Sequence, residues 1–218
     1  MDNAAPATQE LLDPPATRPE SPEHSVLAEY AADVCRRIME GLVGSTGEEL
    51  AAMLSIEADR LRAAAVDPTS LADQPPAAEP PMYDRKGRLY IPMNPVAGPR
   101  NPLAPPMTLV RSGVECEFRV VLPLQYQGPR GKLHGGYCAV LLDEALWQAV
   151  RDNVPGISFT RELTVSYDKP VPLFEEVTIT GRVSRVDGRK TFAEGEIVAG
   201  GEVRARGKGL WISPKPRT

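Results

Sequence analysis

Residues 128–151, GPRGKLHGGYCAVLLDEALWQAVR, decide how the rest of the chain is interpreted. A Gly/Pro-rich approach ends in His134-Gly135-Gly136, and the fourteen residues that follow are apolar on every side except at three positions. A helix with this pattern is typical of a protein core rather than of a surface. It is also too short to cross a bilayer. The stretch therefore predicts a buried helix that begins directly after the two glycines.

Asp143 lies in the middle of this helix, where a carboxylate is costly unless it has a partner or a chemical role. At the helix N-terminus, Gly135 and Gly136 permit a sharp turn and leave N–H groups that favour developing negative charge. This is the chemistry of an oxyanion site. Asp143 is seven residues beyond Gly136, which is about 10 Å along the axis at 1.5 Å per residue. If both groups act on one small carbonyl, they must come from two copies of the helix, in a dimer.

Strand-like segments surround the helix. Apolar and polar residues alternate in each of them, as in half-buried strands. Asp187-Gly188 is a hairpin turn signal, and Gly200-Gly201 separates the last two segments. One strand, a long apolar helix and four strands with short turns predict an α+β fold in which an antiparallel sheet wraps around the helix. The expected strands are residues 114–120, 163–167, 177–183, 191–199 and 202–212.

The motif and its context resemble a known family. His134-Gly-Gly with an Asp nine residues after the His, followed by RELTVSYDKPVP at 161–172 and three more strand-like segments, resembles the hotdog-fold acyl-CoA thioesterases. The similarity is to the phenylacetate-pathway type within the 4-hydroxybenzoyl-CoA thioesterase superfamily, and it includes NPLAPP at 101–106. It covers roughly residues 94–213, about half of the chain. It implies a hotdog fold and thioester hydrolysis.

The resemblance also implies roles for individual residues. Asp143 would act as a general base that activates water, or as a nucleophile that forms a transient anhydride. Gly136, and with it Gly135, would donate an N–H to the thioester oxygen. His134 would shape the loop or position substrate, and Thr160 falls where related enzymes place a Ser or Thr that holds the water or the carboxylate. Glu144, about 100° round the helix, is expected to be structural.

The sequence departs from the family pattern at one position before the motif. Some members have an Asn six residues before the motif His, where this chain has Gly128, so that backbone or Gln127 would have to substitute. Tyr137 and Trp147 would shape the acyl tunnel unless they only pack in the core. Basic residues around one turn are candidate contacts for the CoA phosphates, with an ordinary solvated face as the alternative. They are Arg182, Arg185, Arg189 and Lys190, and Arg204, Arg206 and Lys208 share one face of the last strand.

Composition excludes several classes of function. The net charge of −4 and a pI of about 5.4 leave no general basic field for nucleic acid. Three cysteines without CxxC spacing indicate buried, reduced thiols, and two histidines cannot form a His/Cys metal cluster. Neither a P-loop nor a GxSxG elbow is present. No secretory signal or membrane span is visible, so we expect a cytoplasmic protein without a cofactor.

The N-terminal half is expected to differ from the catalytic half. A helical hairpin is indicated by Ser21-Pro22 at the first helix start and by Thr46-Gly-Glu-Glu49 as a capping box for the second. Dense prolines then indicate a linker, with a short strand at 88–92. The expected parts are a disordered tail at 1–24, the helical hairpin at 25–67, the linker at 68–106 and the hotdog domain at 107–214.

The sequence therefore predicts an acyl-CoA thioesterase of lipid metabolism. Its substrate would carry a medium or long acyl chain or an aromatic acyl group, and the protein would be a homodimer or homotetramer. The alternative is a non-catalytic hotdog module that binds acyl-CoA or an acyl-carrier protein, with the N-terminal helices as an interaction element or a lid. A hotdog hydratase would need an Asp/His pair at a different spacing, which the motif does not supply.

Overall fold

The structure, a computed structural model, describes residues 33–41, 48–64, 82–83, 89–90, 94–98 and 101–215. The chain divides into two compact units, Met1–Pro92 and Met93–Thr218. The predicted disordered tail at 1–24 lies outside the described residues, as do the predicted cap at Ser21-Pro22 and Thr46-Gly47 of the second predicted cap.

In the first unit, residues 33–41 are helical and α3 spans Glu48–Ala64. Two short strands, β1 (Met82–Tyr83) and β2 (Leu89–Tyr90), pair antiparallel. The described helices fall within the predicted hairpin, and β2 falls at the predicted short strand. The expectation of a buried thiol is wrong for Cys35, which is exposed on the first helix, whereas Cys116 and Cys138 are buried and all three are free.

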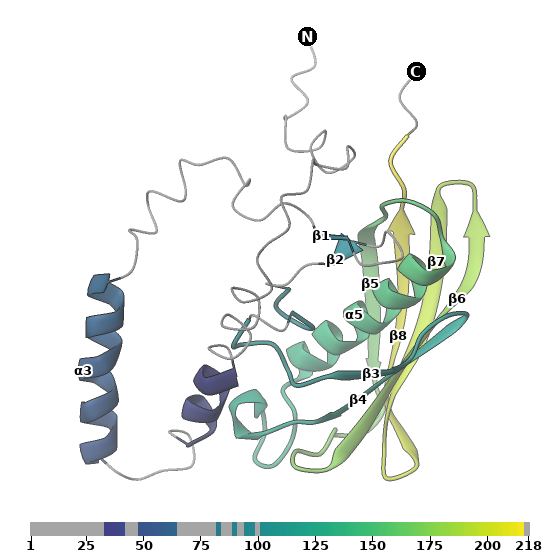
Figure 1. The fold of residues 1–218 in the computed structure, drawn as a ribbon. Coiled ribbons are helices and arrows are strands. Elements are labelled where there is room, and N and C mark those ends of the chain that lie inside the picture. Colours follow the sequence, from purple (N-terminus) through teal and green to yellow (C-terminus); the bar gives the residue numbers. More distant parts are fainter. Residues whose placement is uncertain are drawn as a thin grey trace. The chain divides into compact units, whose positions relative to one another are not determined.

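The second unit is built on one antiparallel sheet in the order β3-β4-β6-β7-β8-β5. The sheet curls around the long helix α5 (Gly135–Asn153), so that the helix lies against its concave face (Figure 1). This arrangement confirms the predicted hotdog fold. The strands are β3 (Thr108–Arg111), β4 (Glu115–Val121), β5 (Phe159–Tyr167), β6 (Glu176–Asp187), β7 (Lys190–Ala199) and β8 (Glu202–Ile212), and a 3-10 helix, η1 (Leu124–Tyr126), precedes α5.

Strand β3 was not predicted. All four of its residues are exposed, so the burial alternation that identifies a half-buried strand is missing there. Its place in the sheet comes from pairing with β4, with a register shift between Leu109 and Arg111. The other five strands coincide with the predicted segments, although β5 and β6 extend further.

A row of glycines lets α5 lie close to the sheet. Gly181, Gly195 and Gly207 pair directly across β6, β7 and β8. A Cβ at Gly181 would lie 2.4 Å from the Ala145 carbonyl oxygen, and a Cβ at Gly207 would lie 3.2 Å from the Leu142 Cβ. Because these positions carry no side chain, the helix backbone can occupy the space. The apolar residues of α5 then fill the core on either side of the row.

Residues 94–106, predicted as the end of the linker, belong to the same compact unit as the sheet. Ala104 is buried and Val96 packs against the main core cluster. The Tyr126 hydroxyl donates a hydrogen bond to the Leu103 carbonyl oxygen (3.2 Å). The unit therefore begins at Met93, upstream of the predicted boundary at residue 107.

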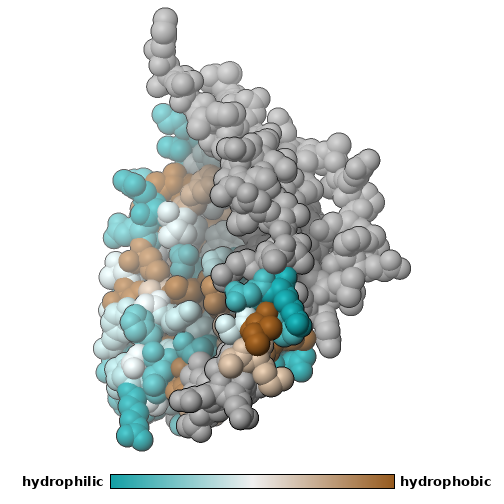
Figure 2. Space-filling model, turned by 90° about the vertical axis from the view of Figure 1, so that its left-hand side faces the viewer, coloured by the Kyte–Doolittle hydropathy of each residue, from teal (hydrophilic) through white to brown (hydrophobic). Residues whose placement is uncertain are grey.

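The surface of the described part mixes hydrophobic and hydrophilic residues. Figure 2 shows brown and teal residues interspersed over one face of the molecule. No helix among the described residues is long and apolar enough to cross a membrane.

Candidate functional site

The HGG motif forms the N-terminus of α5. His134 is the N-cap residue, and its Nδ1 accepts a hydrogen bond from the Gly136 N–H (3.0 Å). The His134 carbonyl oxygen accepts from the N–H groups of Tyr137 (2.9 Å) and Cys138 (3.3 Å). His134 thus satisfies two of the N–H groups that a helix start leaves without helical partners, those of Gly136 and Tyr137, and its carbonyl oxygen also accepts the first helical hydrogen bond, from Cys138.

Space, rather than backbone conformation, favours glycine at Gly136, whereas Gly135 has room for a small side chain. Neither Gly135 nor Gly136 is among the described glycines with positive φ, so the sharp turn expected from the sequence is not their reason. A Cβ at Gly136 would lie 3.1 Å from the His134 Nδ1, and a Cβ at Gly135 would lie 3.5 Å from the Tyr167 ring. The bare backbone leaves the helix start exposed to an incoming group.

Tyr167 is a residue at this motif that sequence reasoning placed only in a strand. Its hydroxyl, at the end of β5, donates a hydrogen bond to the Gly135 carbonyl oxygen (3.1 Å). The strand alternation had placed its side chain on the same face as Leu163 and Val165. A partner 32 residues away in sequence leaves no local signal that could have identified this contact.

Asp143 is half-buried on α5, and Thr160 of β5 donates a hydrogen bond from its Oγ1 to the Asp143 Oδ1 (3.3 Å). The structure thus brings together the two residues that the resemblance had paired. Burial raises the pKa of Asp143, and the hydrogen bond from Thr160 partly opposes that rise. A carboxylate whose pKa is raised is a stronger base than an ordinary aspartate, which suits it to take a proton from water.

The neighbouring Glu144 points to a different environment. It is only 7% exposed, and the Asn94 Nδ2 donates a hydrogen bond to its Oε2 (3.1 Å). Burial raises the pKa of Glu144, while the Asn94 hydrogen bond and the charge of Arg151 act in the opposite direction. The Asn94 Oδ1 also accepts from the N–H groups of Val96 (2.7 Å) and Ala97 (3.2 Å). Glu144 therefore fixes a loop to the helix, which agrees with its expected structural role.

The missing family Asn is explained by the backbone before the motif. A Cβ at Gly128 would lie 2.7 Å from the His134 Cα, so a side chain there would displace the motif itself. Gln127 does not substitute freely, because its Oε1 accepts from the Gly131 N–H (2.7 Å) and braces the turn. Gln125 in η1 is a further carboxamide, and both of its polar side-chain atoms are buried without a hydrogen-bond partner in the described part of the chain.

The two aromatic residues predicted for the acyl tunnel are packed. Tyr137 makes an edge-to-face contact with Tyr126 (4.8 Å between ring centroids) and lies against the main core cluster. Trp147 lies against a second cluster around Trp211, and the Arg151 guanidinium sits over its ring at 4.7 Å. Both side chains are partly buried. Tyr137 directly follows Gly136, and Trp147 lies four residues after Asp143 on α5.

The predicted CoA-binding residues lie in β6 and at its hairpin with β7. Arg182 pairs with Glu194. The Arg185 guanidinium covers the Phe192 ring at 4.1 Å, and the Arg189 Nη1 donates to the Ser213 carbonyl oxygen (2.9 Å). Lys190 faces Asp187 across the hairpin register. All four are exposed, and these contacts do not involve the HGG motif or Asp143.

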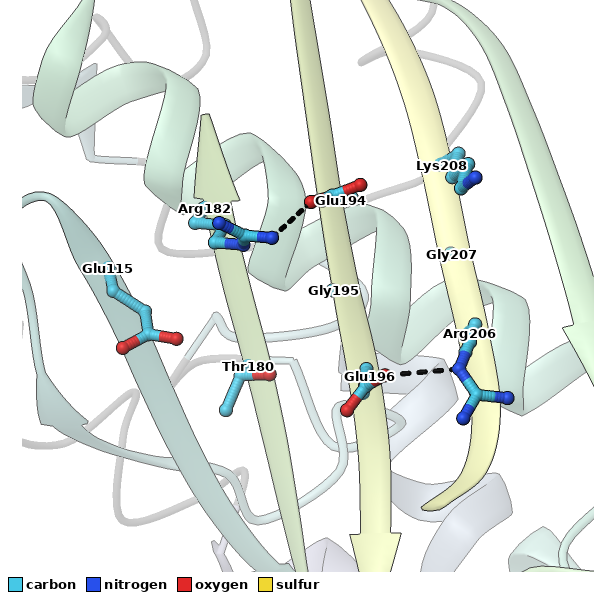
Figure 3. Close-up of a pocket in the computed structure, with 9 residues that line it drawn as sticks. All are labelled: Glu115, Thr180, Arg182, Glu194, Gly195, Glu196, Arg206, Gly207 and Lys208. Carbon is cyan, nitrogen blue, oxygen red and sulfur yellow. Dashed lines mark hydrogen bonds and ion pairs between the residues drawn. The ribbon is translucent and has the colours of Figure 1, made fainter. Parts of the chain in front are cut away.

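A groove of about 280 Å³ crosses the middle strands of the sheet (Figure 3). Gly195 and Gly207 form part of its floor, and a Cβ added at either glycine would point toward α5. Successive side chains of a strand point to opposite faces of the sheet, so the side chains next to these glycines point away from the helix. The groove therefore opens on the face opposite the helix and is separate from Asp143. Its charged lining is largely paired within itself, since Arg182 contacts Glu194 and Arg206 contacts Glu196. The remaining lining residues are Glu115, Thr180 and Lys208.

No cluster of three or more His, Cys, Asp or Glu side chains in the described part of the chain is arranged to hold a metal ion. Two groups are assembled at α5 and β5. One is a half-buried carboxylate, Asp143, with a hydroxyl partner, and the other is the N-terminus of α5, whose first two residues are glycines. These groups can perform proton transfer and oxyanion stabilisation.

Comparisons with known proteins agree with this chemistry. The family model of the thioesterase superfamily matches residues 130–205. The crystal structure of a thioesterase superfamily protein is similar along nearly the whole chain. It is 30% identical, with a TM-score of 0.70, and the match covers 93% of this chain and 95% of that one.

Among curated proteins, the chain is similar to the acyl-coenzyme A thioesterase THEM4 of Mus musculus, with 32% identity over 69 residues, 32% of this chain and 29% of that protein. The THEM4 protein of Xenopus laevis is 35% identical over 71 residues, 33% of this chain and 32% of that protein. The matched segment spans about a third of the length of these relatives.

Proposed function

This chain belongs to the thioesterase superfamily, and on that premise we propose that it hydrolyses acyl-CoA thioesters to a free acid and CoA. The mouse and Xenopus relatives are named acyl-coenzyme A thioesterases, which favours CoA as the carrier. The proposed acyl groups are medium or long chains or aromatic acids, because the flanks of α5 around Asp143 are apolar.

The position of β5 is the observation that carries the proposal. It is an edge strand that pairs only with β8 among the described strands, and most of its residues are exposed. One end of β5 holds Thr160, which binds Asp143, and the other end holds Tyr167, which binds Gly135. The two halves of the site are thus attached to opposite ends of one open strand, and within one protomer they stay apart, since Gly136 and Asp143 are about 10 Å apart along the axis of α5.

A second copy resolves this separation. If two β5 strands pair antiparallel about a twofold axis near Leu163, the Thr160 end of one strand meets the Tyr167 end of the other. Asp143 of one protomer then lies beside the HGG motif of its partner, and each dimer has two equivalent sites. The same pairing removes an exposed sheet edge, which proteins otherwise have to protect.

The proposed reaction uses these groups in a simple order. Asp143 accepts a proton from water as the water oxygen attacks the thioester carbon, or it attacks that carbon itself. The carbonyl oxygen becomes an oxyanion and accepts a hydrogen bond from Gly136 N–H, which exchanges its His134 acceptor for the substrate. The tetrahedral intermediate then collapses with loss of the CoA thiolate, which takes up the proton from Asp143 or from solvent. Where Asp143 is the nucleophile, collapse leaves an acyl anhydride on Asp143, and a water molecule then cleaves it to release the free acid and restore the carboxylate. Arg185, Arg189 and Lys190 at the β6–β7 hairpin are proposed contacts for the CoA phosphates.

Steady-state release of free thiol from short, long and aromatic acyl-CoAs tests the proposal. Asp143→Ala and Asp143→Asn should each lower kcat by about 10²–10⁴-fold, the usual contribution of a positioned general base. Size-exclusion chromatography should show that both variants keep the oligomeric state of the wild type. The acyl group with the highest kcat/KM would define the substrate class.

Two results would count against hydrolysis at this carboxylate. One is full activity in the Asp143 variants. The other is a wild-type protein that binds acyl-CoA without turnover on any member of the panel, which would favour a non-catalytic acyl-CoA-binding module.

A further inference from the structure

A single peptide group at the start of α5 is held from both ends. The peptide between Gly135 and Gly136 presents its carbonyl oxygen to the Tyr167 hydroxyl at 3.1 Å. Its N–H donates to the His134 Nδ1 at 3.0 Å. In the proposed mechanism, this N–H donates a hydrogen bond to the oxyanion of the tetrahedral intermediate.

The two contacts differ in how firmly they are fixed. His134 is an exposed side chain, and its imidazole can rotate away when another acceptor arrives. Tyr167 ends β5 and pairs in register with Ala205, which is fully buried. The next two N–H groups, of Asp168 and Lys169, both donate to the Arg204 carbonyl oxygen at 2.9 Å. The backbone that carries the Tyr167 hydroxyl is therefore anchored to β8.

Holding the carbonyl oxygen also sets the direction of the N–H. A peptide group is planar, so fixing its C=O fixes where its N–H points. A hydrogen bond to the carbonyl oxygen also polarises the group and strengthens donation from the N–H. The contact does not depend on the missing side chain of Gly135, because an added Cβ would lie 3.5 Å from the Tyr167 ring, an ordinary van der Waals distance.

We propose that Tyr167 is a positioning residue that holds the Gly135–Gly136 peptide, so that the Gly136 N–H meets the thioester oxygen after His134 releases it. The inference rests on the proposed function and adds to it a residue on the edge strand. The two hydrogen bonds to the Gly135–Gly136 peptide then have different roles. His134 occupies the N–H in the free protein, and Tyr167 keeps the peptide in place during the exchange.

Tyr167→Phe removes the hydroxyl and keeps the ring against Gly135. We expect kcat to fall by about tenfold, less than the loss of a whole oxyanion donor, while KM changes by less than about twofold. The Kd of a thioether analogue of the best acyl-CoA should not change, because that analogue has no carbonyl oxygen to meet the N–H. A structural defect would alter this Kd as well.

Tyr126→Phe is the matched control. It also removes a tyrosine hydroxyl that donates to a backbone carbonyl oxygen, that of Leu103 at 3.2 Å. Tyr126 is buried and Tyr167 is exposed, so Tyr126→Phe should lose at least as much stability in denaturant unfolding as Tyr167→Phe, but only Tyr167→Phe should lose kcat. Analytical ultracentrifugation should show the same oligomeric state for both variants and the wild type.

The outcomes separate the two proposals. A Tyr167→Phe enzyme with wild-type kcat, beside an inactive Asp143→Asn enzyme, would overturn the role of Tyr167 and leave hydrolysis intact. Loss of thioether binding or of the dimer in Tyr167→Phe would also overturn it, since the hydroxyl would then serve the fold. A wild type without turnover would instead remove the proposed function.

Discussion

Asp143 and Glu144 are adjacent carboxylates on one buried helix, and their different partners separate their roles. Asp143 faces β5, where Thr160 donates a single hydrogen bond at 3.3 Å and part of the carboxylate stays accessible. Glu144 is almost enclosed and receives its hydrogen bond from the Asn94 amide. Burial raises the pKa of both groups, but only Asp143 keeps a face on which water or a substrate can be placed.

Replacing Thr160 by Val should shift the pH dependence of the enzyme. The Thr160 hydrogen bond stabilises the ionised carboxylate and lowers the pKa of Asp143, so its removal should raise that pKa. The general base has to be ionised, and activity is lost as pH falls through its pKa. We therefore expect the acid limb of the kcat/KM profile to move to higher pH in Thr160→Val.

Thr108→Val is a suitable control for that profile, because Thr108 is an exposed residue of β3, at the other edge of the sheet from β5. An acid limb that stays in place in Thr160→Val, or moves to lower pH, would show that this hydroxyl does not govern the reactive carboxylate.

At the scale of elements, the distance between α5 and the sheet is set by the glycine row of Gly181, Gly195 and Gly207. The row crosses three neighbouring strands in register beneath the helix. Gly181 and Gly207 differ in what a side chain would meet. At Gly181 it is the helix backbone, the Ala145 carbonyl oxygen at 2.4 Å, whereas at Gly207 it is the Leu142 side chain at 3.2 Å.

Gly181→Ala should therefore destabilise the fold more than Gly207→Ala. Because a helix backbone cannot move aside locally, we expect a loss of about 1–3 kcal/mol of unfolding free energy at Gly181, the usual cost of overpacking. At Gly207 a small shift of Leu142 and the reduced entropy of the unfolded chain, worth about 0.4–1 kcal/mol, should offset much of the cost. Urea unfolding measures both, and equal losses would show that the helix position does not depend on the row.

Elements that carry a periodic pattern were predictable from the sequence. The apolar run of α5 and the alternation in β4 to β8 identified the sheet and its central helix. Strand β3 and the loop at 94–98 were not predictable, because an exposed strand lacks alternation and the loop is attached to Glu144 by Asn94, 50 residues away. The Thr160 contact to Asp143 was anticipated from the family resemblance, since no local pattern joins a strand residue to a helix residue.

For the whole molecule, the open edge of β5 makes a specific prediction about shared sites. If Asp143 of one protomer works with the HGG motif of its partner, two differently inactivated proteins should restore each other. Asp143→Asn keeps the motif intact. Gly136→Pro keeps Asp143 but has no N–H. It removes no helical hydrogen bond, because the Gly136 N–H bonds the His134 side chain rather than a helix carbonyl, and the exposed His134 ring, 3.1 Å from an added Cβ, has to move aside.

In a mixed dimer, one site combines both defects and the other site combines Asp143 of the proline variant with the intact motif of the asparagine variant. Random subunit exchange at equal concentrations would make half of the dimers mixed, so we expect about a quarter of wild-type activity to return. Free-thiol release before and after exchange measures it, with an Asp143→Asn and Asp143→Ala mixture as the control without recovery. No recovery in the test mixture, with mixed dimers demonstrated by mass spectrometry, would mean that each protomer builds its site from its own Asp143 and Gly136.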